Sequence, residues 1–297
     1  MRVLVTGATG YVGSRLVPEL LGAGHDVVAA SRDPSALDDY PWGDDVEHRT
    51  LDITDPDLVR RAVEGLDAVI YLVHSMESDD FVRKDREAAE RVAAACAAAG
   101  VSQVVYLSGL VPDGELSDHL RSRQEVEKVF LDAPVPAIVL RASMVVGAGS
   151  TSYELLRRLS ERVPLVTPVP AWMRSSIQPI AVEDVVLLIV AALGVTDPAD
   201  RNRHVDVGGD EVLTYPQLLA RFAEVAGLRR VRLVVPGVPK WVVGRACARI
   251  SGLPRTEVTS LVESLRHDMV CADDAVRGVL VDEDFLFTGL TEALRRS

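Results

Sequence analysis

The sequence predicts an α/β protein: a doubly wound parallel sheet with a smaller, mostly helical C-terminal domain interleaved with it. Three observations favour this fold. The chain opens with an apolar strand, MRVLVT, which runs through a glycine-rich turn into a helix. Strand and helix patterns then alternate six times within about 140 residues, as in sheets with helices on both faces. The strand LDAVIYLV is apolar throughout, as expected when both of its faces are covered.

The turn after the first strand carries three glycines at fixed spacing, Gly7, Gly10 and Gly13. Gly7 permits a tight turn, Gly10 lets the backbone approach a pyrophosphate, and Gly13 lets strand and helix pack closely. The helix that follows presents free amides and the positive end of its dipole to a phosphate. We therefore expect a dinucleotide site here, because a merely tight turn does not require three glycines at this spacing.

The remaining elements of the first region follow from apolar runs and from helix signals. Pro56 suits the first turn of a helix, and Gly100 suits the position just past the end of one. Ligands of such sheets bind beyond the carboxyl ends of the strands, so the residues that follow each strand are the candidates for a site. Strands are expected at residues 1–6, 26–30, 46–51, 66–73, 103–107 and 136–140, and helices at 14–24, 56–64, 79–99 and 116–131.

The second region is less regular. We expect residues 1–150 to form the dinucleotide-binding domain, with 177–208 folding back onto it. Residues 151–176 and 209–297 would form the smaller domain. The proline-containing stretch 163–171 is expected to be a loop. Helices are expected at 151–162, from about 183, and at 214–226, 239–250 and 255–265, with one more sheet strand at 203–207.

Composition excludes several classes of protein. The chain has 297 residues, 48% of them hydrophobic, and a formal net charge of −12, which argues against nucleic acid and anionic membranes as main partners. Cys96, Cys247 and Cys271 are an odd number without CxxC spacing, so they fit free thiols in the cytoplasm. No apolar run reaches membrane-spanning length, and the chain does not open like a signal peptide. The histidines lack metal-ligand spacing, so no metal is expected.

These segments, taken in order, resemble an atypical, extended-type short-chain dehydrogenase/reductase (SDR) of the NAD(P)-binding Rossmann superfamily. The segment HVDVGGDEVLTYPQLL resembles the part of extended members that leads into their substrate domain. The resemblance covers nearly the whole chain but does not identify a substrate or an oligomeric state. The other segments that carry it are TGATGYVG, AASRDP, LDITDP, YLVHS, VVYLSGL, LRASMVVGAGS and QPIAVEDV.

The resemblance implies a set of cofactor-binding residues. The turn would wrap the pyrophosphate, a pair after the third strand would lie beside the adenine, and two later strand ends would line the ribose and the nicotinamide. In that order the residues are Thr6, Gly7, Thr9, Gly10, Tyr11, Val12 and Gly13; Asp52 and Ile53; Val73, His74 and Ser75; and Ala142, Ser143, Met144 and Val145.

Arg32 bears on the choice between NADP and NAD. NAD enzymes usually have an acid at the end of the second strand, which binds the ribose 2′-hydroxyl. Here Ser31 and Arg32 occupy that place, and a guanidinium can hold a 2′-phosphate. We expect NADP, with NAD possible because Asp33 is placed to reach the ribose instead. A solvated surface charge is the alternative for Arg32.

The catalytic pattern departs from the family. Ser108 stands at the expected strand end, but the next helix has His119 and Arg123 in place of a Tyr and Lys four residues apart. Residues four apart share a helix face, so His119 could pass a proton while Arg123 keeps it neutral. A pH–rate limb near 6 to 7 would follow. In the alternative, this is an ordinary charged helix face with ion pairs Arg121–Glu125 and Arg123–Glu127.

Two functions remain open from the sequence. The first is an NADP-dependent oxidoreductase, or an epimerase- or dehydratase-like enzyme, acting by hydride transfer on a small molecule. The second is a cofactor-binding protein without turnover, such as a redox sensor or an assembly factor. The missing Tyr–Lys pair favours the second, whereas Ser108 and the substrate-domain segments favour the first.

Overall fold

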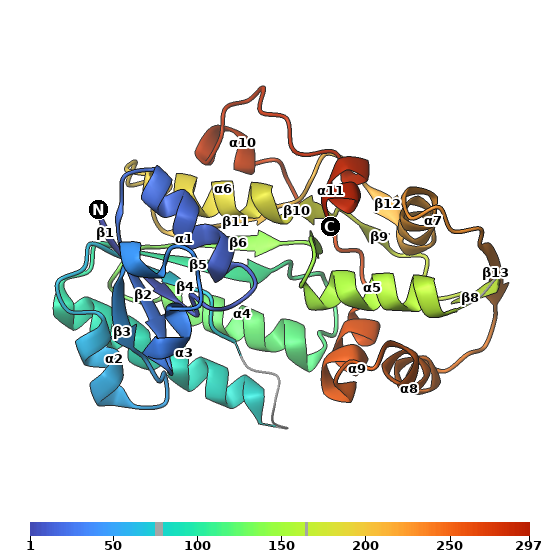
Figure 1. Cartoon of the computed structure of the whole chain (residues 1–297), viewed down its shortest axis with the longest axis horizontal. Coiled ribbons are helices and arrows are strands. Elements are labelled where there is room, and N and C mark those ends of the chain that lie inside the picture. The colour runs from blue at the N-terminus through green and yellow to red at the C-terminus, as the bar shows by residue number, and fades with distance from the viewer. Residues whose placement is uncertain (75–79, 164–165) are drawn as a thin grey trace.

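A computed structural model describes residues 1–74, 80–163 and 166–297. Its centre is a seven-stranded parallel sheet in the order β3-β2-β1-β4-β5-β6-β11 (Figure 1). The order reverses between β1 and β4, so the predicted doubly wound sheet is confirmed. The strands are β1 (Arg2–Thr6), β2 (Asp26–Ser31), β3 (Glu47–Thr50), β4 (Ala68–Tyr71), β5 (Gln103–Gly109), β6 (Ala137–Ala142) and β11 (Arg203–Val207).

Helices cover both faces of the sheet (Figure 1). Alternate residues of β1 point to opposite sides, so Val3 and Val5 join one apolar cluster and Leu4 joins the other. The first cluster packs beneath α1 (Gly13–Gly22) and α6 (Val182–Leu193). The second packs against the helices of the opposite face, which are α2 (Pro56–Ala62), α3 (Phe81–Ala99) and α4 (Asp118–Leu131).

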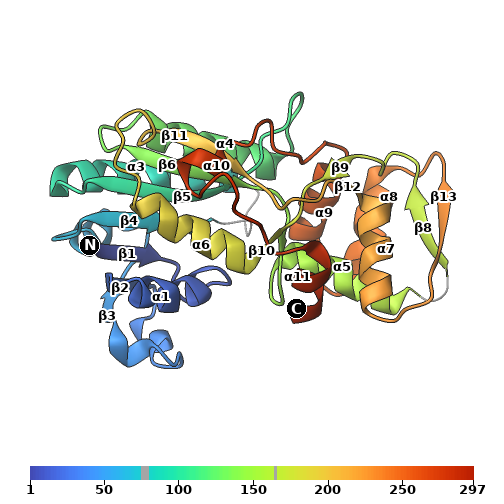
Figure 2. The same ribbon diagram turned by 90° about the horizontal axis from the view of Figure 1, so that it is seen from above.

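The second region lies at one end of the sheet, toward which β6 points (Figures 1 and 2). Four of its helices form where the sequence predicts them, to within a few residues, namely α5 (Thr151–Arg162), α7 (Tyr215–Val225), α8 (Lys240–Ser251) and α9 (Arg255–Ser264). Two short helices, α10 (Val276–Val279) and α11 (Leu290–Arg296), were not predicted. Short strand pairs join these helices to the sheet, namely β10 (Ile180–Ala181) with β7 (Val145–Val146), and β12 (Leu213–Thr214) with β9 (Ser176–Ile177).

One expected loop is a strand. The prediction for residues 163–171 is wrong, because β8 (Val166–Pro170) pairs in parallel with β13 (Val231–Val235) at the far tip of the molecule (Figure 2). Proline has no amide hydrogen, which argues against a central strand. This ribbon has only two strands, and Pro168 and Pro170 fall at alternate positions, so both can face away from the single partner.

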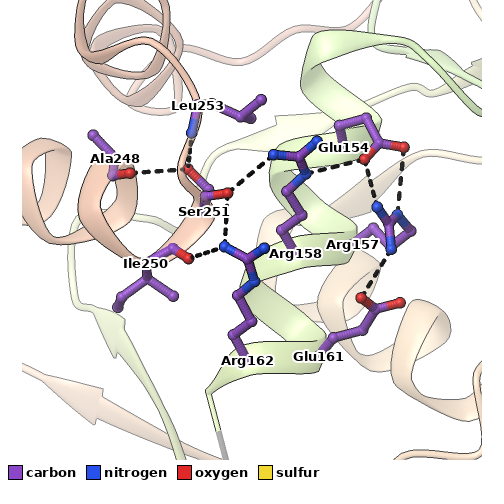
Figure 3. A network of polar contacts seen from close by, with 9 residues as sticks. All are labelled: Glu154, Arg157, Arg158, Glu161, Arg162, Ala248, Ile250, Ser251 and Leu253. Carbon is purple, nitrogen blue, oxygen red and sulfur yellow. Dashed lines mark hydrogen bonds and ion pairs between the residues drawn. The ribbon is translucent and has the colours of Figure 1, made fainter.

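Helix α5 is fastened to α8 by its arginines (Figure 3). Arg162 Nη1 donates to the carbonyl of Ile250 at 2.7 Å, and Arg158 Nη1 donates to that of Ser251 at 3.1 Å. These carbonyls belong to the last turn of α8, where unpaired acceptors and the negative end of the helix dipole attract cations. Glu154 in turn holds Arg157 and Arg158. The contacts fix α5 and α8 relative to each other.

Within the described residues, none of the helices combines the length and the apolarity needed to cross a bilayer. The three cysteines are free thiols.

Candidate cofactor and substrate site

A cavity of about 990 Å³ opens beyond the carboxyl ends of the strands. It brings together nearly all of the residues that the sequence singles out. Thr6 does not line it, and Ser75 lies outside the described residues. Those that line it are Gly7, Thr9, Gly10, Tyr11, Val12, Gly13, Arg32, Asp52, Ile53, Val73, His74, Ser108, His119, Arg123, Ala142, Ser143, Met144 and Val145.

The glycine-rich turn has the geometry of an anion cradle. Gly7 has a φ of +68°, which a side chain would strain. A Cβ on Gly13 would collide with the Gly7 carbonyl oxygen and lie 2.9 Å from Ala8 Cα, so only glycine fits there. No side chain caps the start of α1, and the amides of Tyr11 and Val12 have no acceptor among the described residues. These free amides fit a pyrophosphate.

Thr6 serves the sheet rather than the cavity. Its buried hydroxyl donates to the Ile70 carbonyl at 3.2 Å and accepts from the Leu72 amide at 3.0 Å. The side chain therefore ties the end of β1 to β4. It therefore helps to position the glycine-rich turn that follows β1.

Tyr11 packs against the loop that follows β7. A Cβ on Gly147 would collide with the Tyr11 hydroxyl, and one on Gly149 would lie 3.2 Å from its ring. The Arg15 guanidinium lies 4.4 Å from the ring centroid and donates to the Ala148 carbonyl at 2.9 Å. The GAGS segment is thus held against the glycine-rich turn.

Arg32 and Asp33 have different surroundings at the adenosine end. The exposed Arg32 guanidinium makes no hydrogen bond or ion pair with any described residue. Asp33 Oδ1 accepts from the Ser35 amide at 3.1 Å and from its hydroxyl at 2.6 Å, which caps a short 3-10 helix, η1 (Pro34–Leu37). Hydrogen bonds from Thr54 lower the pKa of Asp52 and fix that carboxylate in a turn. The charge of Arg32 also contributes to the lowered Asp52 pKa, and its exposed guanidinium is the cationic group at this part of the cavity.

Ser108, His119 and Arg123 meet at the other end of the cofactor wall. Ser108 Oγ is buried and makes no hydrogen bond of ordinary geometry. It nevertheless lies close enough to the Tyr106 phenol to lower the pKa of that group. The rings of His119 and His74 lie 6.5 Å apart between centroids. Arg123 Nη1 donates to the Leu107 carbonyl at 2.9 Å, which aims the guanidinium at the end of β5.

The histidines of this site are held neutral. Burial, and then the charge of Arg123, lower the pKa of His119 to about 3. The charge of Arg123, followed by burial and by His119, lowers the pKa of His74 well below its usual value, although the ring is still accessible from the cavity. The expected pH–rate limb of His119 near 6 to 7 is therefore wrong, because too few imidazolium ions exist at that pH.

The ion pairs expected for an ordinary charged helix face are not the ones observed. Arg121 pairs with Asp118 at 3.4 Å, and Arg123 reaches the Leu107 carbonyl instead of Glu127. Glu127 is buried and accepts from Arg141 Nε at 2.9 Å. Arg123 thus faces the cavity rather than pairing along the helix surface.

The half of the cavity farther from the glycine-rich turn is apolar, and most of its wall was not predicted from the sequence. The spacing of polar and apolar residues in α5, α7 and α9 predicts which face of each helix is turned inward. It does not predict whether that face contacts another helix or lines a cavity. Trp172 does not line the cavity, and its indole Nε1 donates to the Val238 carbonyl at 2.9 Å. The apolar wall consists of Leu120, Leu155, Leu156, Leu159, Met173, Ile177, Leu218, Leu219, Leu261, Leu265 and Met269.

One hydrogen bond joins the two halves of the cavity. Ser143 Oγ, just after β6, donates to the Met269 carbonyl at 3.0 Å. The same carbonyl accepts from the Gln178 amide at 3.0 Å.

Within the described part of the chain, no group of three or more His, Cys, Asp or Glu side chains is placed to hold a metal ion.

Comparisons with known proteins agree with this geometry. A family model described as NAD(P)H-binding matches residues 7–143. A ceramide reductase of Caulobacter vibrioides is 29% identical over 249 residues, which cover 80% of this chain and 74% of that protein. A (4-alkanoyl-5-oxo-2,5-dihydrofuran-3-yl)methyl phosphate reductase of Streptomyces griseus is 31% identical over 234 residues, covering 76% and 74%. This chain belongs to the NAD(P)H-binding, atypical SDR family.

Solved structures share the fold of this SDR chain. A nucleoside-diphosphate-sugar epimerase of Staphylococcus aureus superposes with a TM-score of 0.79 at 16% identity, covering 99% of this chain and 100% of that one. A triphenylmethane reductase of Citrobacter, complexed with NADP(H), gives 0.78 at 17% identity, covering 100% and 99%. The predicted family is confirmed, and the chain contains an NAD(P)H-binding domain.

Proposed function

We propose that this SDR protein is an NADP(H)-dependent reductase of a carbonyl group on a small molecule. The observation that carries the proposal is one cavity with the glycine-rich turn at one end and Ser108, His119 and Arg123 at the other. The two relatives described above are both named as reductases, which supports this direction. In this proposal residues 1–150 with 177–208 hold the cofactor, residues 151–176 and 209–297 hold the substrate, and the free thiols suit the cytoplasm.

The preference for NADP rests on two neighbouring side chains. Arg32 is exposed and unpaired beside the cavity, so it can give a 2′-phosphate charge-assisted hydrogen bonds. Asp33 is the acid that could instead bind a 2′-hydroxyl, but its Oδ1 already accepts two hydrogen bonds from Ser35. This arrangement supports NADP over NAD.

The site residues act on the carbonyl oxygen. When bound, NADPH supplies a hydride to the carbonyl carbon while the oxygen takes up a proton, which leaves NADP⁺ and an alcohol. Ser108 Oγ is buried without a hydrogen-bond partner of ordinary geometry, so it would donate to that oxygen and pass it a proton that solvent supplies through cavity water. His119, neutral at pH 7, would be a second hydrogen-bond donor. Arg123 would hold His119 neutral and stabilise the developing negative charge.

A second function is kept because the Tyr–Lys pair is missing. The chain has HLRSR at that place, and neither His119 nor Arg123 is a proton donor at pH 7. A protein that binds NADPH without turnover, as a redox sensor or an assembly factor, would have the same cofactor cradle. Turnover distinguishes the two.

The test is NADPH binding followed by NADPH oxidation, measured as fluorescence and as loss of absorbance over a panel of aldehydes and ketones. We expect tight binding, oxidation by at least one class of carbonyl, and a 10²- to 10³-fold lower kcat for Ser108→Ala, the range for one lost transition-state donor. The affinity for NADPH should be unchanged in that variant. Binding without oxidation by any carbonyl would leave the non-catalytic function in its place.

A further inference from the structure

We infer that the substrate half of the cavity takes a long, uncharged apolar chain, so that the substrate is an aliphatic or similarly apolar carbonyl compound. The inference rests on the proposed function for the reacting group. The apolar character of the substrate is inferred from the residues that form the wall of the cavity. That wall comes from helices far apart in the chain, α5, α7 and α9, which Figure 1 shows gathered at one end of the sheet.

Leucines make up most of the wall. Helix α5 contributes Leu155, Leu156 and Leu159, α7 contributes two more, and one comes from α9 and one from the residue that follows it. Met173 and Met269 line the same space, and methionine adapts to irregular apolar ligands. A surface of this kind gains free energy only when an apolar ligand displaces water from it.

The charges of the cavity exclude a strongly anionic substrate. Among the described lining residues, the guanidinium groups are those of Arg32 at the adenosine end and Arg123 beside Leu107. The substrate half contains a carboxylate, Glu257, and neither lysine nor arginine. The diphosphate of a nucleotide sugar would therefore lie against leucines, without a cationic side chain of this half beside it. Desolvating two phosphates without cationic partners is costly, so this half of the cavity does not suit that ligand.

One polar group of this half, Ser264, already makes hydrogen bonds within the protein. Ser264 Oγ donates to the Ser260 carbonyl at 3.0 Å and lies 3.2 Å from Ser117 Oγ. That second contact joins α9 to the start of α4. Tyr215 is buried, and burial raises the pKa of its phenol, so it stays neutral. Ser264 is therefore not available to recognise a sugar.

The apolar wall begins directly beside the proposed reacting end. Leu120 is the neighbour of His119 on α4 and lines the cavity with it. A chain whose carbonyl meets Ser108 and His119 would thus run from Leu120 toward the leucines of α5 and α9. The wall is also stiff, because Arg158 and Arg162 hold α5 against α8 (Figure 3). Arg266 Nη2 donates to the Glu115 carbonyl at 2.9 Å and ties the end of α9 to the segment before α4.

Chain length provides the test. Initial rates of NADPH oxidation are measured with straight 2-alkanones from 2-pentanone to 2-tridecanone, and UDP-glucose is the polar probe. Each added methylene that is buried should lower KM by about three- to fourfold until the cavity is filled. UDP-glucose should neither bind at millimolar concentration nor inhibit. A KM independent of chain length, with short ketones still reduced, would overturn the inference and leave the proposed function intact.

Variants locate the effect in the wall. Leu261→Gln on α9 and Leu219→Gln on α7 each place an amide in the cavity, and both leucines are only half-buried, so the fold should tolerate them. Both variants should flatten the dependence of KM on chain length while the affinity for NADPH stays unchanged. Leu253→Gln is the matched control, because Leu253 is half-buried but does not line the cavity.

A binding arm separates the two proposals when turnover fails. The neutral dye Nile red should fluoresce in the cavity, and 2-tridecanone should displace it more strongly than 2-pentanone. Displacement that depends on chain length, with no oxidation of NADPH by any ketone, would overturn the proposed reductase but support the apolar site. The apolar site is refuted if neither ketone displaces the dye from the wild-type protein. It is also refuted if the dye binds to Leu261→Gln and to Leu219→Gln as tightly as it binds to wild type.

Discussion

The rings of His74 and His119 lie 6.5 Å apart, one from the end of β4 and the other from the first turn of α4. Arg123, one turn after His119, lowers the pKa of both rings. The three groups therefore share one end of the cavity with a single positive charge between them at neutral pH. That charge is the fixed guanidinium, whereas the two imidazoles are neutral donors or acceptors.

Acid should destabilise the protein through His119. Its pKa is about 3 in the folded chain and near 6.5 in the unfolded chain, so the unfolded chain binds more protons below pH 6.5. The contribution to stability is complete above pH 6.5 and is lost as pH falls toward 3. We expect His119→Gln to lose less stability than wild type between pH 7.5 and 5, measured by urea unfolding. Equal losses would show that His119 is not held neutral by the fold.

Arg32→Ala should weaken NADPH binding selectively. Loss of charge-assisted hydrogen bonds to a 2′-phosphate costs about 1.5–3 kcal/mol, which corresponds to about a 10- to 150-fold higher Kd. The Kd of NADH should change little, and calorimetry measures both. Arg61→Ala is the control, because Arg61 is equally exposed but lies outside the cavity. If both cofactors lost affinity equally, Arg32 would not read the 2′-phosphate.

Two glycines of one turn should separate binding from folding. Gly10 is exposed and has no positive φ, so Gly10→Val should keep the fold and block the pyrophosphate. Its Cβ would lie 3.1 Å from the Gly7 carbonyl oxygen, a contact that a small shift relieves. Gly13→Ala meets backbone atoms of Gly7 and Ala8 and should cost about 1–3 kcal/mol of stability. Thermal melts and NADPH titrations of both variants test the contrast, which a similar fall in Tm for the two would contradict.

Arg141→Met should destabilise the fold without touching the cavity. Arg141 binds buried Glu127 through two hydrogen bonds, and its removal leaves an uncompensated carboxylate inside the protein. Breaking such a pair from one side costs about 3–5 kcal/mol. Arg121→Met, at an exposed pair with Asp118, should change stability by less than about 0.5 kcal/mol. The urea midpoints of the two variants are compared with that of wild type. Equal shifts would show that the buried Arg141–Glu127 pair contributes no more to stability than the exposed Arg121–Asp118 pair.

The fold could be predicted because local signals agree with the global pattern. Most strands of the first region are apolar runs followed by a turn, and helix signals such as Pro56 and Gly100 lie between them. Residues at strand ends then meet by topology alone, which is why Arg32 and Ser108 line the same cavity. β8 was missed because the rule against proline in strands applies to central strands, not to a two-stranded ribbon.

The pKa shifts of the site and the apolar wall of the cavity could not be predicted from the sequence, because both depend on residues that meet only in the folded chain. Spacing places His119 and Arg123 on one helix face, but it gives neither the burial that moves the pKa of His119 nor the Leu107 carbonyl that holds Arg123. Thr6 shows the reverse case, since its place beside the glycines implied a ligand and its hydroxyl serves the sheet. Leu219 and Leu261 carry ordinary amphipathic signals, and only their convergence reveals a cavity.

The carbonyl of Met269 also limits how this protein can be recombined. It accepts from Ser143 and from Gln178, which both belong to the proposed cofactor-binding part, whereas Met269 itself belongs to the proposed substrate part. A chimera that exchanged residues 209–297 with those of another family member would import a new backbone at this carbonyl while keeping the old serine. Cofactor orientation would then change together with substrate choice. Grafts intended to alter specificity should therefore carry the strand end at Ser143, the Gln178 segment and the Met269 segment as one unit.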